Sequence, residues 1–533
     1  MSAPESDKGK AKPVAVIDIG ANSVRMVIAQ VGADRRVEVL ERTQRAVRLG
    51  HDTFVGGRLG QRTMGAAIAI LRDCKKLLGT YGVESIRAVA TSAVREASNA
   101  DAFVDRVAMA VGLDLEVLDP AEESRLTVSA VRQAVRDVLD VSRGRSLIVD
   151  VGGGSTLLTV LEGGVIAASE SYALGSIRTQ EHLATSEETP DRALDLLRRQ
   201  IANVVEAIKR SMPVQDAESF VAVGEEARFT AQQVGEAVPS NELVSTVERK
   251  AFDRLVADCS RQTTEKLSKK YSLPFASAER VAPALLIYRA LLHATRVDRM
   301  IVCSVSMRDG LLLDMARRVA GDEDPELIES IVRSAETVGE KYRYDAKHAE
   351  HVAGLSVRLF DELQKEHGLT PRHRLLLRVA AILHEVGGFV SSRAHHKHSY
   401  YLIANSEIFG LRHEELQVAA QVARYHRRAS PRPTHIEYLT LPREDRIAVN
   451  KLAALLRVAD ALDRGHAQQV RDLQFEQLPG ELVIYVSGVT DLTIERRAMP
   501  EKSDLFEETY GLKIRLEEAA APAPDARRAS PIE

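Results

Sequence analysis

The sequence contains one pattern twice, and this repeat restricts the possible folds more than any other feature. Residues 14–31 (VAVIDIGANSVRMVIAQV) and 146–164 (SLIVDVGGGSTLLTVLEGG) share an apolar run, an aspartate, a glycine turn, a serine and a second apolar run. An apolar run on each side of a glycine turn is typical of a β-hairpin. Asp18 and Asp150 lie a domain's length apart, so the repeat predicts two duplicated α/β halves that face each other.

Each predicted turn has the composition of a phosphate-binding loop. A tight turn aims several N–H groups at one point, glycine permits close approach, and serine or threonine adds a hydroxyl donor. A carboxylate beside such a turn repels phosphate unless a cation bridges them, so Asp18 and Asp150 are expected to hold Mg²⁺, mostly through water. The candidate phosphate ligands are Gly20, Asn22, Ser23, Gly152, Gly153, Gly154, Ser155 and Thr156.

The remaining patterning divides the chain into segments. Eleven of the 15 histidines lie between His348 and His435, within a run of amphipathic helices, which marks that stretch as a separate unit. The last part reads as strands at 470–476, 481–486, 492–497 and 512–516. The expected segments are disordered residues 1–12, phosphate-binding domains at 13–135 and 136–320, a helical domain at 321–466, a small β-rich domain at 467–517 and a disordered tail at 518–533.

Composition excludes several classes of protein. The 533 residues carry a net charge of −4, no tryptophan and 4% aromatic residues, which argues against base stacking and specific nucleic-acid binding. No apolar run is long enough to span a membrane, and the start lacks the apolar core of a signal peptide. Cys74, Cys259 and Cys303 are too widely spaced for a metal or redox motif. We expect a cytoplasmic protein that does not bind membranes.

Three further segments carry a family resemblance. The segments VATSAVREASNADAF (89–103), VLDPAEESRLTVSAV (117–131) and YALGSIRTQEHL (172–183) resemble, in this order, motifs of the exopolyphosphatase/guanosine pentaphosphate phosphohydrolase (Ppx/GppA) family. The resemblance runs from about Val14 to about Leu516. It implies duplicated ribonuclease H-like halves of the actin, sugar kinase and heat-shock chaperone ATPase superfamily. An all-α HD-like domain and a small α+β element would follow.

The resemblance implies a role for particular residues. Glu123, the second residue of the Glu-Glu pair, would be the general base. Ser92, Arg95 and Arg178 would contact phosphate, while Arg25 would offset its charge together with Arg95. Hydrolysis of a phosphoanhydride needs a positioned water, a neutralised phosphoryl group and a proton acceptor. From its position alone, Glu123 could instead be a charge that stabilises the start of a helix.

The implied function is an exopolyphosphatase that removes terminal phosphate from inorganic polyphosphate by Mg²⁺-assisted attack of water. Guanosine pentaphosphate is the alternative substrate, and a homodimer is expected because it would extend a polyphosphate channel across two chains. A weakly active or non-catalytic regulator that binds polyphosphate or an alarmone is the alternative function.

Three departures from the family pattern favour the regulator. Leu157 stands where the family usually has a glutamate after Gly-Gly-Gly-Ser-Thr. The segments VAVGEEARFTA (221–231) and SVSMRDGLL (304–312) also differ from the family's turns. Glu225 and Glu226 would place negative charge near the path of a polyanion.

The histidine-rich stretch resembles the HD superfamily of metal-dependent phosphohydrolases. HD sites carry His-Asp, whereas LHEVG (383–387) has His-Glu, so a structural or polyanion-binding role is expected and a second divalent metal is the alternative. Two basic clusters, at 393–398 and 424–428, favour a groove for a polyanion. The aligned residues are His348, His384, Glu385, His398, His426 and Asp460.

Overall fold

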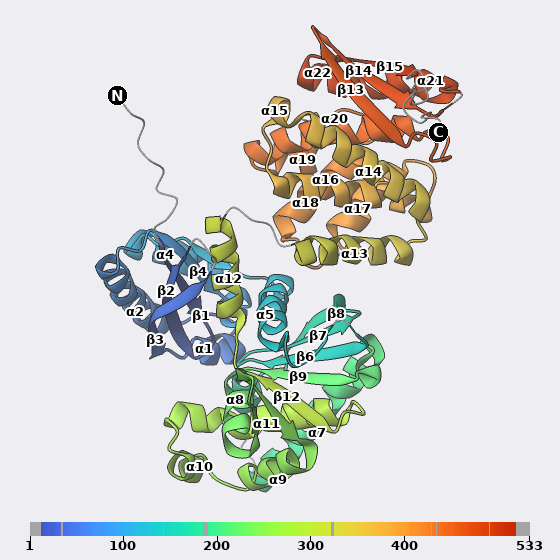
Figure 1. The fold of residues 1–533 in the computed structure, drawn as a ribbon. Helices are drawn as coiled ribbons and strands as arrows, with labels where there is room; N and C mark the ends of the chain where they lie inside the picture. The colour runs from blue at the N-terminus through green and yellow to red at the C-terminus, as the bar shows by residue number, and fades with distance from the viewer. Residues whose placement is uncertain are drawn as a thin grey trace, which may run out of the picture. The chain divides into compact units, whose positions relative to one another are not determined.

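The computed structural model forms two compact units, Met1–Pro325 and Glu326–Glu533 (Figure 1). It describes residues 12–32, 36–141, 143–184, 190–320, 325–406, 408–427, 429–432, 434–489 and 491–518. The predicted boundary at residue 321 falls outside these residues. The two predicted disordered ends also fall outside them, except for Lys12 and Glu518. Those two residues belong to paired strands, opposite Val31 and Val486. None of the described helices is both long enough and apolar enough to cross a bilayer.

The first half of the first unit is a five-stranded mixed sheet in the order β3-β2-β1-β4-β5. Strands β1 to β3 form an antiparallel meander, whereas β4 and β5 run parallel to β1. The strands are β1 (Lys12–Ile19), β2 (Ser23–Val31), β3 (Val37–Ala46), β4 (Ser85–Ala90) and β5 (Leu115–Val117). The helices are α1 (Leu49–Gly56), α2 (Gln61–Thr80), α3 (Ser92–Arg95), α4 (Ala100–Val111) and α5 (Pro120–Val135).

The second half is a seven-stranded sheet in the order β10-β11-β12-β9-β6-β7-β8. Its strands are β6 (Arg145–Val151), β7 (Thr156–Glu162), β8 (Val165–Tyr172), β9 (Ser219–Val223), β10 (Glu236–Val238), β11 (Asn241–Glu248) and β12 (Arg299–Cys303). Its helices are α6 (Ser176–Ala184), α7 (Pro190–Ser211), α8 (Glu225–Val234), α9 (Arg249–Cys259), α10 (Thr264–Tyr271), α11 (Phe275–His293) and α12 (Met307–Ala320).

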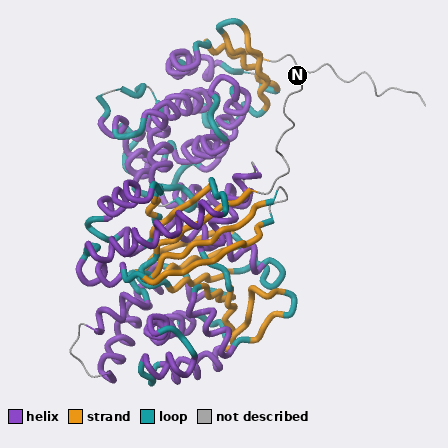
Figure 2. The backbone as a smooth tube through the Cα atoms, turned by 90° about the vertical axis from the view of Figure 1, so that its left-hand side faces the viewer, coloured by secondary structure: helices purple, strands orange, loops and turns teal. Residues whose placement is uncertain are grey.

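The two sheets share one topology, which confirms the predicted duplication. The order β8-β7-β6-β9-β12 repeats β3-β2-β1-β4-β5, with an antiparallel meander followed by two parallel strands in each case. The additional strands β11 and β10 extend the second sheet beyond β12. Figure 2 shows the strands of both sheets flanked by helices. A hydrophobic strand that is buried on both faces needs such cover on each side.

Helix α12 ends the predicted second domain in sequence but packs on the first sheet. Its apolar residues Leu311, Leu312 and Met315 join one core with Val14 and Val27 of β1 and β2. It also packs closely against α5, because a Cβ on Gly310 would lie only 2.0 Å from the carbonyl oxygen of Leu126. The close approach of these two helices supports the start of α5, where Glu122 and Glu123 lie.

The second unit is a helical bundle with a small sheet. Helix α20 is buried continuously from Leu452 to Leu462 and packs against α14, α16 and α18. The helices are α13 (Pro325–Lys341), α14 (Ala346–Glu362), α15 (Gln364–His367), α16 (Pro371–Leu383), α17 (His395–Ala404), α18 (His413–Arg424), α19 (Ile436–Leu439) and α20 (Arg443–Leu462), with a 3₁₀ turn at Val386–Phe389.

The small sheet contains β13 (Asp472–Leu478), β14 (Glu481–Ser487) and β15 (Lys513–Glu518). The strand predicted at 492–497 is wrong, because this segment starts helix α21 (Thr493–Lys502), which α22 (Asp504–Tyr510) follows. Asp491 accepts a hydrogen bond from the backbone N–H of Thr493 at 2.8 Å, which favours the start of a helix. Leu492 and Met499 are buried at a helical spacing of two turns.

The contact between α5 and α12 predicts a specific stability loss. Gly310→Ala should lower the free energy of unfolding by about 1–3 kcal/mol, since the added methyl group meets the backbone at Leu126. Chemical denaturation monitored by circular dichroism would measure the change. Gly65→Ala in α2 is the matched control: its Cβ meets nothing within 4 Å, and a stabilisation of about 1 kcal/mol is expected. Equal stability of Gly310→Ala and the wild type would contradict the close packing.

Candidate active site

The two glycine turns have the same backbone geometry. In the first turn, the N–H of Gly20 donates to the carbonyl oxygen of Ser23 at 3.0 Å. In the second, the N–H of Gly152 donates to the carbonyl oxygen of Ser155 at 2.9 Å. Each turn joins the end of one strand to the start of its hairpin partner. The repeat in the sequence is therefore also a repeat of local structure.

The second turn packs against the first turn and against the start of α3. A Cβ on Gly153 would lie 3.2 Å from the Cβ of Ala21. A Cβ on Gly154 would lie 2.5 Å from the hydroxyl oxygen of Ser92. A Cβ on Gly175, at the start of α6, would lie 2.4 Å from the carbonyl oxygen of Gly153. Gly153 and Gly154 therefore pack with little free space against residues of the first half, and Gly175 packs against the backbone of the second turn itself.

Two of the predicted phosphate ligands hold the second turn in shape. The hydroxyl group of the fully buried Thr156 donates to the carbonyl oxygen of Leu174. Arg178 donates from Nε to the carbonyl oxygen of Gly154 at 2.6 Å and forms an ion pair of 2.5 Å with Glu96. The Thr156 hydroxyl hydrogen is thus donated to a backbone carbonyl, and a contact of Thr156 with phosphate stays a prediction. Arg178 is likewise held against protein groups.

Glu123 lies in the first turn of α5, which Asp119 caps by accepting a hydrogen bond from the N–H of Glu122 at 2.7 Å. Its side chain is 16% exposed, and its Oε2 lies 3.0 Å from Nη1 of Arg95. Burial raises the pKa of Glu123 to about 7, against the opposing charge of Arg95, while Asp150 and Asp18 raise it further. A carboxylate with such a pKa can accept a proton near neutral pH.

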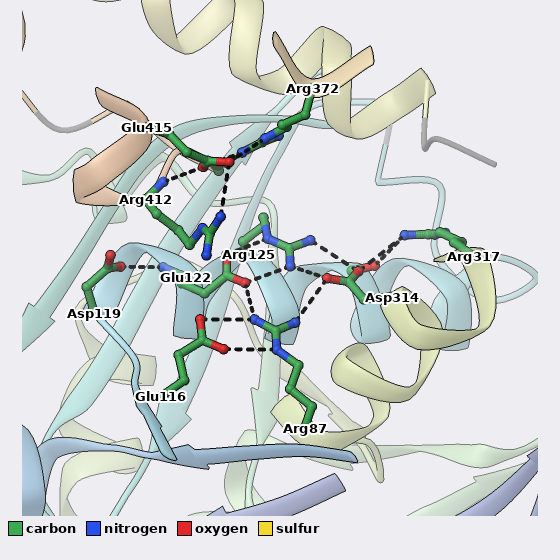
Figure 3. A network of polar contacts seen from close by, with 12 residues as sticks. Arg87, Glu116, Asp119, Glu122, Arg125, Asp314, Arg317, Arg372, Arg412 and Glu415 are labelled. Atoms are coloured by element: carbon green, nitrogen blue, oxygen red, sulfur yellow. Dashed lines mark hydrogen bonds and ion pairs between the residues drawn. The ribbon is translucent and has the colours of Figure 1, made fainter. Parts of the chain in front are cut away.

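The neighbouring Glu122 has a different environment (Figure 3). It lies 2.6 Å from Nε of Arg125 and 3.2 Å from Nη2 of Arg87, while Arg125 also pairs with Asp314 of α12. Burial alone would raise the pKa of Glu122, but Arg125 and Arg87 hold it below its ordinary value. Glu116 completes the network by pairing with Arg87 at 3.1 Å. Glu122 therefore anchors α5, while Glu123 pairs with one arginine, Arg95, in the part of the chain that the structure describes.

Asp18 and Asp150 differ in their ionic partners. Oδ2 of Asp18 lies 2.7 Å from Nη1 of Arg308, a residue at the start of α12 that sequence analysis did not assign to the site. The sequence contains one indication of this role, because Arg308 lies in the segment 304–312 that departs from the family pattern. No ion pair with Asp150 occurs among the described residues. Burial raises the pKa of Asp150 to about 6, although Arg228 and Arg308 lower it.

The position of Leu157 breaks the symmetry of the two hairpins. Leu157 lies opposite Asp150 in the β6–β7 pair, as Arg25 lies opposite Asp18 in the β1–β2 pair. Directly opposed residues of an antiparallel pair point to the same face of the sheet. One aspartate thus has a cationic neighbour across the hairpin, and the other has an apolar neighbour that is 9% exposed.

A cavity of about 420 Å³ opens beside the first turn. Within it, Oε2 of Glu225 lies 2.7 Å from Arg25 and 3.1 Å from Arg280, and Glu226 lies 3.2 Å from Arg280. The charge of these two glutamates is therefore compensated, contrary to the repulsion expected from the sequence. Polar residues of the lining are Asn22, Ser23, Arg25, Gln44, Glu225, Glu226, Ser277 and Arg280.

The donors around Asp150 fit a hard divalent cation such as Mg²⁺. Asp18, Asp150 and Glu123 offer carboxylate oxygens, the ligands that Mg²⁺ prefers. Among the described residues, no three acidic groups of this site lie close enough together to ligate one ion directly. An Mg²⁺ ion here would need water and phosphate oxygens to complete its shell, and this binding stays a prediction.

The helical unit brings most of the predicted HD-like residues together, but His395 takes the place expected for His398. His348, His384 and Asp460 offer ligand atoms within 4.8 Å of one another, as do Glu385, His395 and His426. His398 belongs to neither set, whereas His395 takes part. Helix α17 begins at His395, directly after Ala394 at a positive φ of 58°, so the first histidine of the run HHKH reaches the cluster. His466 and Asp463, which pack on His348, were also not predicted.

The second predicted basic cluster exposes Arg427 among its described residues. His426 is buried, and Arg424 pairs with Glu437 at 3.0 Å. Arg428 lies outside the described residues. Exposed positive charge in these stretches is provided by Arg393, Lys397 and Arg427.

The duplicated halves carry matching glycine turns at the ends of corresponding strands of two related sheets. Residues 13–319 match the Ppx/GppA phosphatase family, and residues 332–492 match Ppx/GppA phosphatase domain III. The chain therefore belongs to the Ppx/GppA phosphatase family and is a hydrolase of phosphoanhydride bonds. The match to domain III covers most of the helical unit, and the HD-like character of that unit stays a prediction.

Individual relatives are distant in sequence. The guanosine-5′-triphosphate,3′-diphosphate pyrophosphatase of Vibrio campbellii is 25% identical, with 79% of this chain and 82% of the relative covered. The protein of the same name from Pseudoalteromonas translucida is 26% identical, with the same coverage. The crystal structure of an exopolyphosphatase from Cytophaga hutchinsonii, at 21% identity, has a TM-score of 0.52 and covers 58% of this chain and 99% of its own. The last likeness shows the fold.

The contact of Glu123 with Arg95 predicts a shift in pH dependence. A general base must be deprotonated, so hydrolysis should fall as the pH drops below about 7. Arg95 lowers the pKa of Glu123, so Arg95→Met should move the acidic limb of kcat/KM upward by about one to three pH units. The exposed Arg106→Met is the control and should leave the limb in place. An unchanged limb in Arg95→Met would show that another group titrates.

Proposed function

We propose that this chain removes the terminal phosphate of inorganic polyphosphate, with Glu123 as the general base for the attacking water. The observation that carries the proposal is the position of Glu123. Its carboxylate has a pKa of about 7, lies beside Arg95 and is close enough to Asp18 and Asp150 to be affected by their charge. This coupling of Glu123 to the aspartates of both glycine turns supports its role as the proton acceptor that phosphoanhydride hydrolysis requires.

Other residues near Glu123 would bind the phosphate and neutralise its charge. The N–H groups of the two turns and the hydroxyl groups of Ser23, Ser92 and Ser155 would hold the terminal phosphate. Arg95 would offset charge on the phosphoryl group and keep Glu123 oriented. Mg²⁺, when bound near Asp18 and Asp150, would bridge phosphate oxygens and neutralise their charge. Positioning and electrostatics supply most of the rate gain in this reaction class.

A second substrate, guanosine pentaphosphate, is favoured by the cavity beside the first turn. Arg25 and Arg280 provide hydrogen-bond donors there, and Glu225 provides an acceptor, so a polar heterocycle linked to the phosphates has suitable partners. Inorganic polyphosphate has no group that needs such a cavity. The relatives from Vibrio campbellii and Pseudoalteromonas translucida are named for a guanosine nucleotide of this kind.

The role of Glu123 predicts a large loss of turnover in Glu123→Gln. Removing the proton acceptor while keeping the shape should lower kcat for phosphate release from long-chain polyphosphate by about 10²–10⁴-fold. The exposed Glu265→Gln, also in the first turn of a helix, is the matched control and should keep full activity. Release measured with Mg²⁺ present would test both. Full activity of Glu123→Gln would remove Glu123 as the base.

The same assay tests the non-catalytic alternative through Leu157. The proposal expects the wild type to release phosphate. No release by the wild type, together with release by Leu157→Glu but not by the uncharged Leu157→Gln, would overturn the proposal. Binding of polyphosphate without turnover would then identify a regulator.

The cavity predicts a split between the two substrates. Arg280→Met should raise KM for guanosine pentaphosphate at least about tenfold, since it removes a charged hydrogen-bond donor from the cavity, and should change KM for polyphosphate little. Steady-state kinetics on both substrates would measure the ratio. Arg254→Met on α9, with an exposed side chain, is the control. A loss that is equal for both substrates would contradict a nucleoside site in the cavity.

A further inference from the structure

Asp314 of α12 lies between two largely buried arginines of the first half. It contacts Arg125 of α5 and Arg87 of β4 (Figure 3). Burial alone would raise the pKa of Asp314, but Arg125 and Arg87 hold it below its ordinary value. Asp314 is therefore ionised at neutral pH, and its charge is available to hold both guanidinium groups in place.

These three residues and Glu122 form a closed ring of alternating charge. Glu122 lies 2.6 Å from Nε of Arg125 and 3.2 Å from Nη2 of Arg87. Asp314 accepts a hydrogen bond from Nη1 of Arg125 at 3.2 Å and lies 3.7 Å from Nη1 of Arg87. The four side chains are between 7% and 12% exposed, so water and salt weaken these contacts little.

The ring joins the two segments that supply Glu123 and its arginine partner. Arg87 lies in β4, and the chain continues from that strand into α3, which ends at Arg95. Glu122 and Arg125 lie on either side of Glu123 in α5. Because Glu122 contacts both arginines of the ring, the start of α5 is held against β4. This attachment supports the distance of 3.0 Å between Oε2 of Glu123 and Nη1 of Arg95.

The helix that carries Asp314 also reaches the first glycine turn. At the start of α12, Nη1 of Arg308 lies 2.7 Å from Oδ2 of Asp18. Gly310 then packs against the backbone of Leu126 in α5, and Asp314 follows further along the same helix. One helix thus contacts Asp18 at one point and α5 at two points, so it relates the position of the first turn to that of the Glu-Glu pair.

Stability alone does not explain a ring of largely buried charges. Taking charged groups out of water is costly, and apolar side chains of similar volume often give equal or greater stability. The ring adds direction, because the planar guanidinium fork binds a carboxylate at two points and in one plane. Loss of one member would allow its partners to turn, and a displacement of about 1 Å at a reacting group can lower turnover about 10²-fold.

We propose that Asp314 is a positioning residue for the hydrolysis of phosphoanhydrides. It holds Arg125, Arg125 holds Glu122, and the helix start that they fix directs Glu123 towards the attacking water. Asp314 therefore acts on the reaction through α5 and does not touch the substrate. The inference rests on the proposed role of Glu123 as the base, and it holds for polyphosphate and for guanosine pentaphosphate alike.

The test is a double-mutant cycle on phosphate release by the full-length protein with Mg²⁺, using whichever of the two substrates the wild type hydrolyses faster. Asp314→Asn keeps the shape of the side chain and removes its charge. It should lower kcat about 10- to 100-fold and change KM less than about threefold. In the Glu123→Gln background it should lower kcat further by less than about twofold, because the base that it positions is already absent.

Glu415→Gln is the matched control, because Glu415 is 10% exposed, pairs with Arg372 at 2.7 Å and lies in the second unit. It should leave kcat within about twofold of the wild type. Circular dichroism would show whether each variant is folded. If Asp314→Asn does not fold, Asp314→Glu enters the same cycle. It keeps the charge and adds one methylene, so kcat should fall about 3- to 10-fold.

Two outcomes would overturn the role of Asp314. One is an unchanged kcat in the folded Asp314 variant. The other is an equal loss of kcat in the wild-type and Glu123→Gln backgrounds, which is the result for a residue that acts only on stability or on another group. Full activity of Glu123→Gln would instead contradict the proposed base, so the two failures can be told apart.

Discussion

The direct contact between the two glycine turns is the constraint on which the catalytic half of the molecule depends. A Cβ on Gly153 would lie 3.2 Å from the Cβ of Ala21, and one on Gly154 would lie 2.3 Å from Cζ of Phe54, so the second turn packs closely on the first half. The two sheets can therefore present their strand ends to one point. A phosphate at that point would meet N–H groups from both halves, and no long side chain would have to reach it.

Bringing strand ends together also brings carboxylates together, and arginines compensate for much of this charge. Arg308 pairs with Asp18, Arg95 with Glu123, and Arg25 and Arg280 with Glu225. The contrast between Glu122 and Glu123 shows how much the surroundings matter. These two neighbours in the chain have pKa values shifted in opposite directions, because Glu122 pairs with two arginines and Glu123 with one among the described residues. One glutamate anchors α5, and the other stays able to take up a proton.

Sequence patterns predicted the features that are local in the chain. The hairpins, their turns and the duplication follow from apolar runs around Asp18 and Asp150, since strand pairing across a short turn needs only neighbouring residues. The histidine cluster was also largely predicted, from its spacing and its resemblance. Patterns failed where a distant partner decides the outcome. The segment 492–497 forms a helix because Leu492 and Met499 pack on the bundle, although the residues alternate as in a strand.

The sequence by itself determined that this chain has two matching glycine turns on duplicated α/β halves, a Glu-Glu helix start and a separate histidine-rich unit. Each of these depends on residues close together in the chain. Only the tertiary structure decided which groups meet. The packing pairs Arg308 with Asp18 and pairs Glu225 with two arginines. It also brings His395, and not His398, into the histidine cluster. Such contacts join residues that are far apart in the chain, and their distances depend on how helices and sheets pack, which no local pattern encodes.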